Sequence, residues 1–319
     1  MTTSWRSSRP LMGESPSKKT DMISSLEEFN TIEQEVPLAP YTTWNIGGSA
    51  EYFWEPTKDE LSDVLRYCEQ NHIPVHFLGR GSNVLISSDG VDGLAICTRS
   101  SLQGIELQDD VIHAEAGVSM PVLANFAASY EIAGFEHLIC IPGSIGAGIA
   151  INAGLAAHGR KEIGDSLIDV TVMNRSGTVF KERAEDLELG FRTSNIPDRD
   201  LFVLSARFDG SARGTEGEIA SEMHTHLRKR KSKQPLSVPT AGSTFKNPSN
   251  GKSAGWLIDQ AGLKGYQVGG AKVSEVHANW IENTGTATSD DVLDVINHVK
   301  RVVDDEFGIE LEIEIRVLE

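Results

Sequence analysis

Residues 78 to 86 read LGRGSNVLI, a glycine-rich loop between two apolar segments. The segments on either side, 74–78 and 84–86, both have the pattern of short buried strands. A glycine loop of the Rossmann type opens a helix, whose N-terminus holds a dinucleotide pyrophosphate. Because this loop opens a strand instead, the order of elements argues against a Rossmann fold. Its bare backbone amides still suit a phosphate, which such amides can cradle as a nest.

A second stretch dense in small residues follows at 139–154, with the sequence ICIPGSIGAGIAINAG. Taken alone, it is best interpreted as close packing of helices or strands, because glycine lets backbones approach one another. Two such stretches in one region favour a ligand that carries a pyrophosphate.

The rest of the chain alternates between helical and strand patterns. Apolar residues at helical period predict helices at 58–70, 118–132, 215–230 and from 289 to just before Gly308. Strand patterns occur at 111–114, 168–173 and 201–208. Thr57 and Glu60 have the spacing of a capping box in front of the first helix.

The segment 311–317 alternates strictly between apolar and charged residues, which predicts a strand with one charged face. Glu312, Glu314 and Arg316 share that face. Pattern alone therefore does not separate Glu314 from neighbours that point to solvent.

Composition limits the class of protein. At 319 residues with 39% hydrophobic side chains, the chain can form two or three domains, and its 30 glycines favour a loop-rich α/β or α+β enzyme. A net charge of −17 argues against nucleic-acid or anionic-membrane partners, and no apolar run is long enough to span a membrane. The basic run 226–233 is either the solvated end of a helix or a pocket for a small phosphorylated ligand.

Cysteine spacing and the N-terminal sequence both indicate a cytoplasmic protein. Cys68, Cys97 and Cys140 form no disulfide or zinc pattern, which predicts buried free thiols in a reducing compartment. Residues 1–22 are polar and basic without an apolar core, which predicts a disordered extension and not a signal peptide.

The stretch PTAGSTFKNP at 239–248 carries Ser243 in a turn of small residues. It lacks the GxSxG context, and no histidine stands in a pattern that marks it as a partner base, so hydrolase-type nucleophilic catalysis is poorly supported. A serine without a base can still pass a proton to a strongly basic carbanion or enolate. Arg192 suits a bidentate grip on a carboxylate, although pattern alone slightly favours a surface arginine.

Six segments in order resemble the UDP-N-acetylenolpyruvoylglucosamine reductase (UDP-N-acetylmuramate dehydrogenase) family, and the resemblance covers about residues 30–318. The segments are TWNIGG (43–48), LGRGSNVL (78–85), IPGSIG (141–146), FRTS (191–194), AGSTFKNP (241–248) and LEIEIR (311–316). Any one of them is a weak signal, whereas six at the expected spacings are highly specific.

The resemblance implies an α+β fold, in which a two-subdomain FAD-binding fold of the vanillyl-alcohol-oxidase (PCMH) type is joined to a C-terminal α/β substrate-binding domain. The implied segments are the extension 1–22, FAD-binding subdomain 1 at 23–98 completed by 306–319, FAD-binding subdomain 2 at 99–213, and the substrate-binding domain at 214–305.

The resemblance also implies an activity: reduction of UDP-N-acetylglucosamine-enolpyruvate to UDP-N-acetylmuramate by NADPH through FAD, for peptidoglycan synthesis. By motif position, Ser243 delivers a proton, while Arg192 and Glu314 bind and polarise the substrate carboxylate. Lys233 and Asn247 fall where the family binds substrate phosphate or the nicotinamide nucleotide. The implied FAD-binding residues are Gly79, Arg80, Gly81, Ser82, Asn83, Pro142, Gly143, Ser144 and Gly146.

Several further properties follow from the resemblance. Ser82 stands where relatives with covalently attached flavin have histidine, so we expect non-covalent FAD. We expect a monomer with a small-molecule substrate and no metal, nucleic-acid or membrane partner. Phe191 replaces the family's more frequent tyrosine, and 155–161 is longer than the usual segment, which leaves ligand contacts there open. Two alternatives remain: an FAD oxidase that uses oxygen, and a nucleotide-sugar-binding protein without catalysis.

Overall fold

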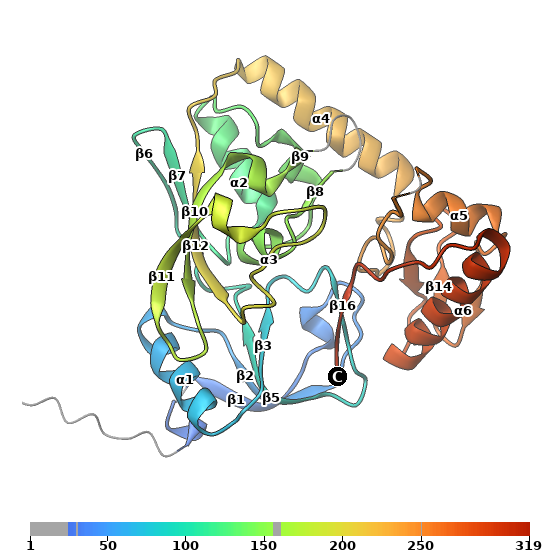
Figure 1. Ribbon diagram of the computed structural model, residues 1–319, viewed down its shortest axis with the longest axis horizontal. Helices are drawn as coiled ribbons and strands as arrows, with labels where there is room; N and C mark the ends of the chain where they lie inside the picture. The colour runs from blue at the N-terminus through green and yellow to red at the C-terminus, as the bar shows by residue number, and fades with distance from the viewer. Residues whose placement is uncertain (1–24, 30, 156–160, 250) are drawn as a thin grey trace, which may run out of the picture.

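The computed structural model describes residues 25–29, 31–155, 161–249 and 251–319. Figure 1 shows two sheets in the N-terminal two thirds of the chain, one above the other in this view, and a smaller unit formed by the C-terminal part. The predicted extension 1–22 lies outside the described residues. The fold mixes helices with largely antiparallel sheets, as the α+β prediction requires.

The first sheet has four strands in the order β1-β2-β5-β3. Their bounds are β1 (Ile32–Pro37), β2 (Ser49–Trp54), β3 (Val75–Leu78) and β5 (Val91–Cys97). Helix α1 (Lys58–Gln70) has the predicted bounds and buries Leu61, Val64 and Leu65. The predicted capping box is wrong in detail, because the Thr57 hydroxyl bonds the Glu60 carboxylate and caps no backbone N–H.

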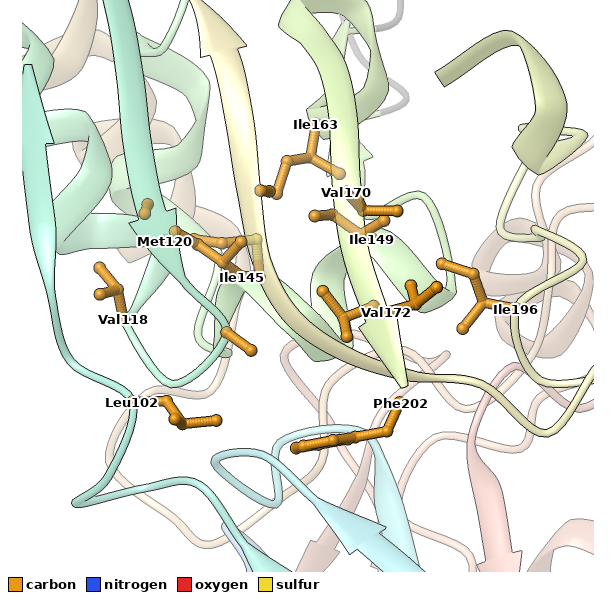
Figure 2. Packing of buried hydrophobic residues seen from close by; sticks show 14 of the residues in the cluster. Leu102, Val118, Met120, Ile145, Ile149, Ile163, Val170, Val172, Ile196 and Phe202 are labelled. Carbon is orange, nitrogen blue, oxygen red and sulfur yellow. The ribbon is translucent and has the colours of Figure 1, made fainter. Parts of the chain in front are cut away.

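The second sheet is antiparallel, with the strand order β11-β10-β12-β7-β6. Its strands are β6 (Ile105–Gln108), β7 (Val111–Glu115), β10 (Leu167–Met173), β11 (Val179–Arg183) and β12 (Phe202–Asp209). Helices α2 (Met120–Ser129) and α3 (Ile145–Ala150) pack on it. Figure 2 shows the apolar core between them, where Ile149 of α3 lies near Val170 of β10 and Ile145 of α3 lies near Met120 of α2.

The C-terminal unit follows a long connecting helix, α4 (Glu216–Lys233), which Thr215 starts with a capping box. Its elements are α5 (Ala254–Gln260), β13 (Gln267–Val268), β14 (Ala271–Val273), β15 (Ile281–Asn283) and α6 (Ser289–Phe307). The apolar face of α6, with Val292, Ile296 and Val299, packs in a second core, which also includes Trp44 and Leu85 from the N-terminal part of the chain. Gly308 ends α6 in the left-handed conformation, with φ 64°, as the predicted stop requires.

The final segment returns from the C-terminal unit to the first loop (Figure 1). Strand β16 (Arg316–Leu318) pairs in parallel with β4 (Val84–Ile86). The predicted strand over 311–317 is therefore too long. Before β16 the chain is extended but bonds to another loop, since Lys246 N–H donates to Glu312 O at 2.9 Å and Glu314 N–H donates to Thr244 O at 2.8 Å.

Short elements complete the described chain. The two-stranded pair consists of β8 (Gly154–Leu155) and β9 (Lys161–Glu162). The 3-10 helices are η1 (Leu26–Glu28), η2 (Ala39–Tyr41), η3 (Glu136–Cys140), η4 (Ile163–Ser166) and η5 (Ala184–Leu187). Among the described residues no helix is long and apolar enough to cross a membrane.

The three cysteines are free and buried, as predicted. Burial raises the pKa of the Cys68 thiol to about 12 and that of Cys97 to about 11. These thiols therefore stay protonated near neutral pH, which suits packing groups and not nucleophiles.

The buried side chain of His137 in η3 leads us to expect that the stability of the protein depends on pH. Its side chain is only 2% exposed, and neither ring nitrogen has a hydrogen-bond partner among the described residues. Burial, helped by the charges of Lys161 and His226, lowers its pKa to about 4. Between pH 6.5 and pH 4, His137 is therefore protonated in the unfolded chain but remains neutral in the folded chain. The free energy of unfolding consequently decreases as the pH falls through this range.

Because of His137, we expect the free energy of unfolding to be about 3 kcal/mol lower at pH 4 than at pH 7. Urea denaturation of the protein between pH 7 and pH 4 measures this loss. His137→Leu should flatten the slope in that window. An unchanged slope in the variant would show that other groups carry the acid sensitivity.

Candidate active site

A cavity of about 590 Å³ lies where loops of both larger sheets meet the C-terminal unit. This volume is in the usual range for small-molecule sites. Its lining includes every predicted site residue except Lys233. The predicted residues that line it are Gly79, Arg80, Gly81, Ser82, Asn83, Pro142, Gly143, Ser144, Gly146, Arg192, Ser243, Asn247 and Glu314.

The first cofactor loop, 79–83, joins β3 to β4 as the sequence predicts. Within the described structure, the backbone N–H groups of 80–83 donate to no protein acceptor. Gly81 has φ +63°, and a Cβ at this position would overlap the carbonyl oxygen of Tyr41. The loop thus packs closely against the backbone at Tyr41, while its N–H groups stay available to a ligand.

The second loop meets the first directly. The Ser82 hydroxyl donates to Pro142 O at 2.5 Å, and a Cβ on Gly79 would overlap the Ser144 hydroxyl. The Ser144 Oγ is buried and has no hydrogen-bond partner in the described structure. Helix α3 begins at once after Ser144, where the sequence indicated only a stretch of small residues. The free amides and this unpartnered hydroxyl fit the pyrophosphate of FAD.

Arg192 and Glu314 form an ion pair on the cavity wall. Arg192 Nε donates to Glu314 Oε1 at 3.0 Å, and Arg192 Nη2 donates to Gly154 O at 2.5 Å. The side chains are 12% and 16% exposed, respectively. Arg192 has φ 59°, an uncommon backbone conformation that often marks functional sites. Its Nη1 is buried and has no hydrogen-bond partner in the part of the chain that the structure describes, which leaves a donor for a ligand carboxylate.

Glu314 differs sharply from the neighbour with which its pattern grouped it. The Glu312 side chain is 76% exposed, whereas Glu314 faces the cavity. Burial raises the pKa of Glu314, and the positive charges of Arg192 and Lys246 oppose this effect. A carboxyl group with a raised pKa can donate a hydrogen bond or a proton at a pH where exposed carboxylates cannot.

Ser243 lines the cavity from the loop that pairs with the Glu314 segment, since Thr244 O accepts from Glu314 N–H at 2.8 Å. It forms an isolated β-bridge with Trp280, after Gly242 with φ +82°. In the described chain no group bonds the Ser243 hydroxyl. The hydroxyl is therefore free to approach a ligand.

The two predicted substrate-binding residues differ in position. Asn247 lines the cavity, and its Oδ1 accepts a hydrogen bond from Ala254 N–H at 3.0 Å. Lys233 is exposed at the end of α4 and does not line the cavity. Burial lowers the pKa of the cavity residue His277, and the charges of Lys264 and then Lys233 add to this effect.

The sequence reasoning missed several cavity residues, including Arg230, His277 and Trp280. Arg230 donates to Cys140 O at 2.5 Å and so ties α4 to the loop that precedes Pro142. It was part of the basic run, and its position on the inner face of α4 was the available signal. His277 stands close to Trp280, with ring centroids 6.0 Å apart, but no local motif marks either residue.

Comparison with known families identifies the class of protein first. Residues 52–182 match a family model described as an FAD binding domain. This range contains both cofactor loops with their free amides. The fold and the site thus define an FAD-binding protein, and the Rossmann alternative is excluded because the first loop opens β4.

The C-terminal region identifies the particular family. Residues 234–318 match the model for the UDP-N-acetylenolpyruvoylglucosamine reductase C-terminal domain. The chain belongs to the UDP-N-acetylenolpyruvoylglucosamine reductase family, and it is an FAD-containing oxidoreductase.

Individual relatives cover nearly the whole chain. The reductase of Synechococcus sp. (strain RCC307) is 41% identical and covers 89% of this chain and 93% of its own. That of Staphylococcus aureus (strain Newman) is 38% identical, with 93% and 96% covered. The crystal structure of the Thermus caldophilus enzyme matches with a TM-score of 0.76 at 34% identity, over 90% of this chain and 99% of that one. The predicted fold class is confirmed.

Proposed function

We propose that this chain reduces UDP-N-acetylglucosamine-enolpyruvate to UDP-N-acetylmuramate, with NADPH as the reductant and non-covalent FAD as the cofactor. The observation that carries the proposal is the convergence of Arg192, Glu314 and Ser243 on one cavity with both cofactor loops. When bound, FAD supplies the chemistry that carries a hydride from NADPH to the terminal carbon of the enolpyruvyl group. The cofactor loops 79–83 and 141–146 would hold it.

Arg192 and Glu314 act on the substrate carboxylate. Hydride addition breaks the carbon–carbon π bond and places an electron pair on the carbon beside that carboxylate. Arg192 Nη1, which has no hydrogen-bond partner among the described residues, donates to the carboxylate. Burial, which raises the pKa of Glu314, favours the protonated form that donates a second hydrogen bond. Both groups stabilise the charge that develops in the transition state.

Ser243 completes the reduction by giving its hydroxyl proton to this carbon. A serine hydroxyl is a weak acid, but an α-carboxyl carbanion is a strong enough base to take its proton. Solvent then returns a proton to the serine oxygen. Lys233 and Asn247 bind phosphate groups of the substrate or of NADPH.

We also propose where the protein works and how its chain is divided into domains. The protein works as a monomer in the cytoplasm, in peptidoglycan precursor synthesis. The segments 23–98 with 306–319, 99–213 and 214–305 act as two FAD-binding subdomains and a substrate-binding domain. The pairing of β16 with β4 supports the assignment of 306–319 to the first of them.

An absorption experiment tests the proposed function. The purified protein should be yellow, should bleach when NADPH is added without oxygen, and should regain its colour when the enolpyruvyl substrate follows. Denaturation should release the FAD, because no covalent link is expected. A protein that carries FAD but is reoxidised only by oxygen, with hydrogen peroxide formed, would instead support an oxidase.

A further inference from the structure

Arg192 lies at the tip of a tight turn. The turn is closed by two backbone hydrogen bonds between Gly190 and Thr193, of 3.0 and 3.4 Å. Arg192 itself is in the left-handed conformation. A long side chain on such a turn needs external contacts to hold its guanidinium in one place.

Asn152 supplies contacts to that turn from the end of α3. Its Nδ2 donates to Gly190 O at 3.0 Å and to Glu162 Oε2 at 2.8 Å, and its Oδ1 accepts from Gly164 N–H at 3.1 Å. The amide group is buried, and both of its ends are used. Asn152 therefore joins the turn that carries Arg192 to the segment that carries Glu162.

Glu162 approaches the same guanidinium from β9. Its Oε1 lies 3.9 Å from Arg192 Nη1, and its strand partner Gly154 accepts the hydrogen bond from Nη2. A separation of 3.9 Å is too long for a hydrogen bond but short enough for strong attraction between two largely buried charges. Glu162 thus attracts the guanidinium while the Nη1 donor stays available.

We propose that Asn152 and Glu162 are positioning residues that aim Arg192 Nη1 at the carboxylate of the substrate. The inference rests on the proposed function, because it takes the ligand of Arg192 to be that carboxylate. Asn152 fixes the turn, Gly154 O and Glu314 hold two of the three guanidinium nitrogens, and Glu162 sets the direction of the third.

A pair of ligands isolates this role. UDP-N-acetylmuramate carries the carboxylate, and UDP-N-acetylglucosamine lacks the whole carboxylate-bearing group. Calorimetry on the FAD-loaded protein would give both affinities for the wild type, Glu162→Gln and Asn152→Ala. In each variant we expect the affinity for UDP-N-acetylmuramate to fall roughly tenfold or more, because a misaimed group loses its contact. The affinity for UDP-N-acetylglucosamine should stay nearly the same.

Matched controls separate positioning from general damage. Glu136 is another buried carboxylate, bonded to Gly134 N–H, and Asn283 is another buried amide, which donates to Trp44 O at 2.8 Å. Glu136→Gln and Asn283→Ala should leave the ratio of the two affinities unchanged.

The outcomes are distinct. Equal weakening of both ligands in Glu162→Gln, or no weakening of either, would overturn the positioning role and leave the proposed function standing. If Asn152→Ala does not fold, Glu162→Gln decides alone. A wild-type protein that carries FAD but binds neither ligand would overturn the proposed function, and this inference with it.

Discussion

In Ser243→Ala, reduction of the bound FAD by NADPH proceeds at the wild-type rate, and reoxidation by the enolpyruvyl substrate slows by about a hundredfold to ten-thousandfold. We expect this split because the hydroxyl takes no part until the substrate carbon needs a proton. The size is that of a lost general acid. Stopped-flow absorbance at the flavin band, with NADPH and substrate added in turn, measures the two steps separately.

Two comparisons make the Ser243 result specific. The Ser62 hydroxyl, unlike that of Ser243, has a protein partner, Gly177 O at 2.9 Å, and it does not line the cavity, so Ser62→Ala should leave both steps unchanged. Ser243→Cys keeps a proton in nearly the same place and should lie between wild type and alanine. Equal slowing of both steps in Ser243→Ala would assign the serine to binding or folding and not to proton transfer.

The second large effect concerns Arg192. Lysine at this position keeps one positive charge but loses the fork that reaches Glu314, Gly154 O and a ligand together. We expect Arg192→Lys to lower kcat/KM for the enolpyruvyl substrate by about a hundredfold to a thousandfold. The rate of FAD reduction by NADPH should change little.

A second arginine provides the control for this substitution. Arg207 grips both carboxylate oxygens of Asp169 in the second sheet and is absent from the cavity lining. Arg207→Lys loses the same kind of fork and should keep full activity. The role of Arg192 would be refuted by a variant that reduces the substrate as fast as wild type does.

Much of this site follows from local sequence. The first loop could be assigned because it opens a strand, and that order survives in β3 and β4. Ser243 and Arg192 could be named because they stand within motifs of several residues. These assignments depend only on the residues that are adjacent in the sequence, so they need no knowledge of the fold.

The burial of Glu314 could not be read from its own segment. The alternating pattern correctly indicated an extended chain at 311–317. The first part of this segment pairs with the loop at 244–246, however, and only its end, in β16, pairs with β4. The face shared by Glu312 and Glu314 turns from solvent to cavity within two residues. Only the distant contacts of the fold decide where that change occurs.

Asn152 and Glu162 were missed for a related reason. They are ten positions apart, a spacing without helical or strand meaning, and they meet because the chain folds back through β8 and β9. Most of the segment 155–161, whose ligand contacts the sequence left open, lies outside the described residues. Sequence patterns predict helices and strands well, whereas contacts between loops can be identified only in the three-dimensional structure.

The backbone of Glu314 is pinned by both halves of the site. Asn83 Nδ2, in the first cofactor loop, donates to Glu314 O at 3.1 Å across 231 positions of sequence, and Thr244, beside Ser243, accepts from Glu314 N–H. The acid, the proton donor and the flavin loop are therefore linked mechanically. A displacement of either loop would therefore shift the backbone that carries the Glu314 carboxyl group, so substitutions in the 79–83 loop can alter the acid without touching its side chain.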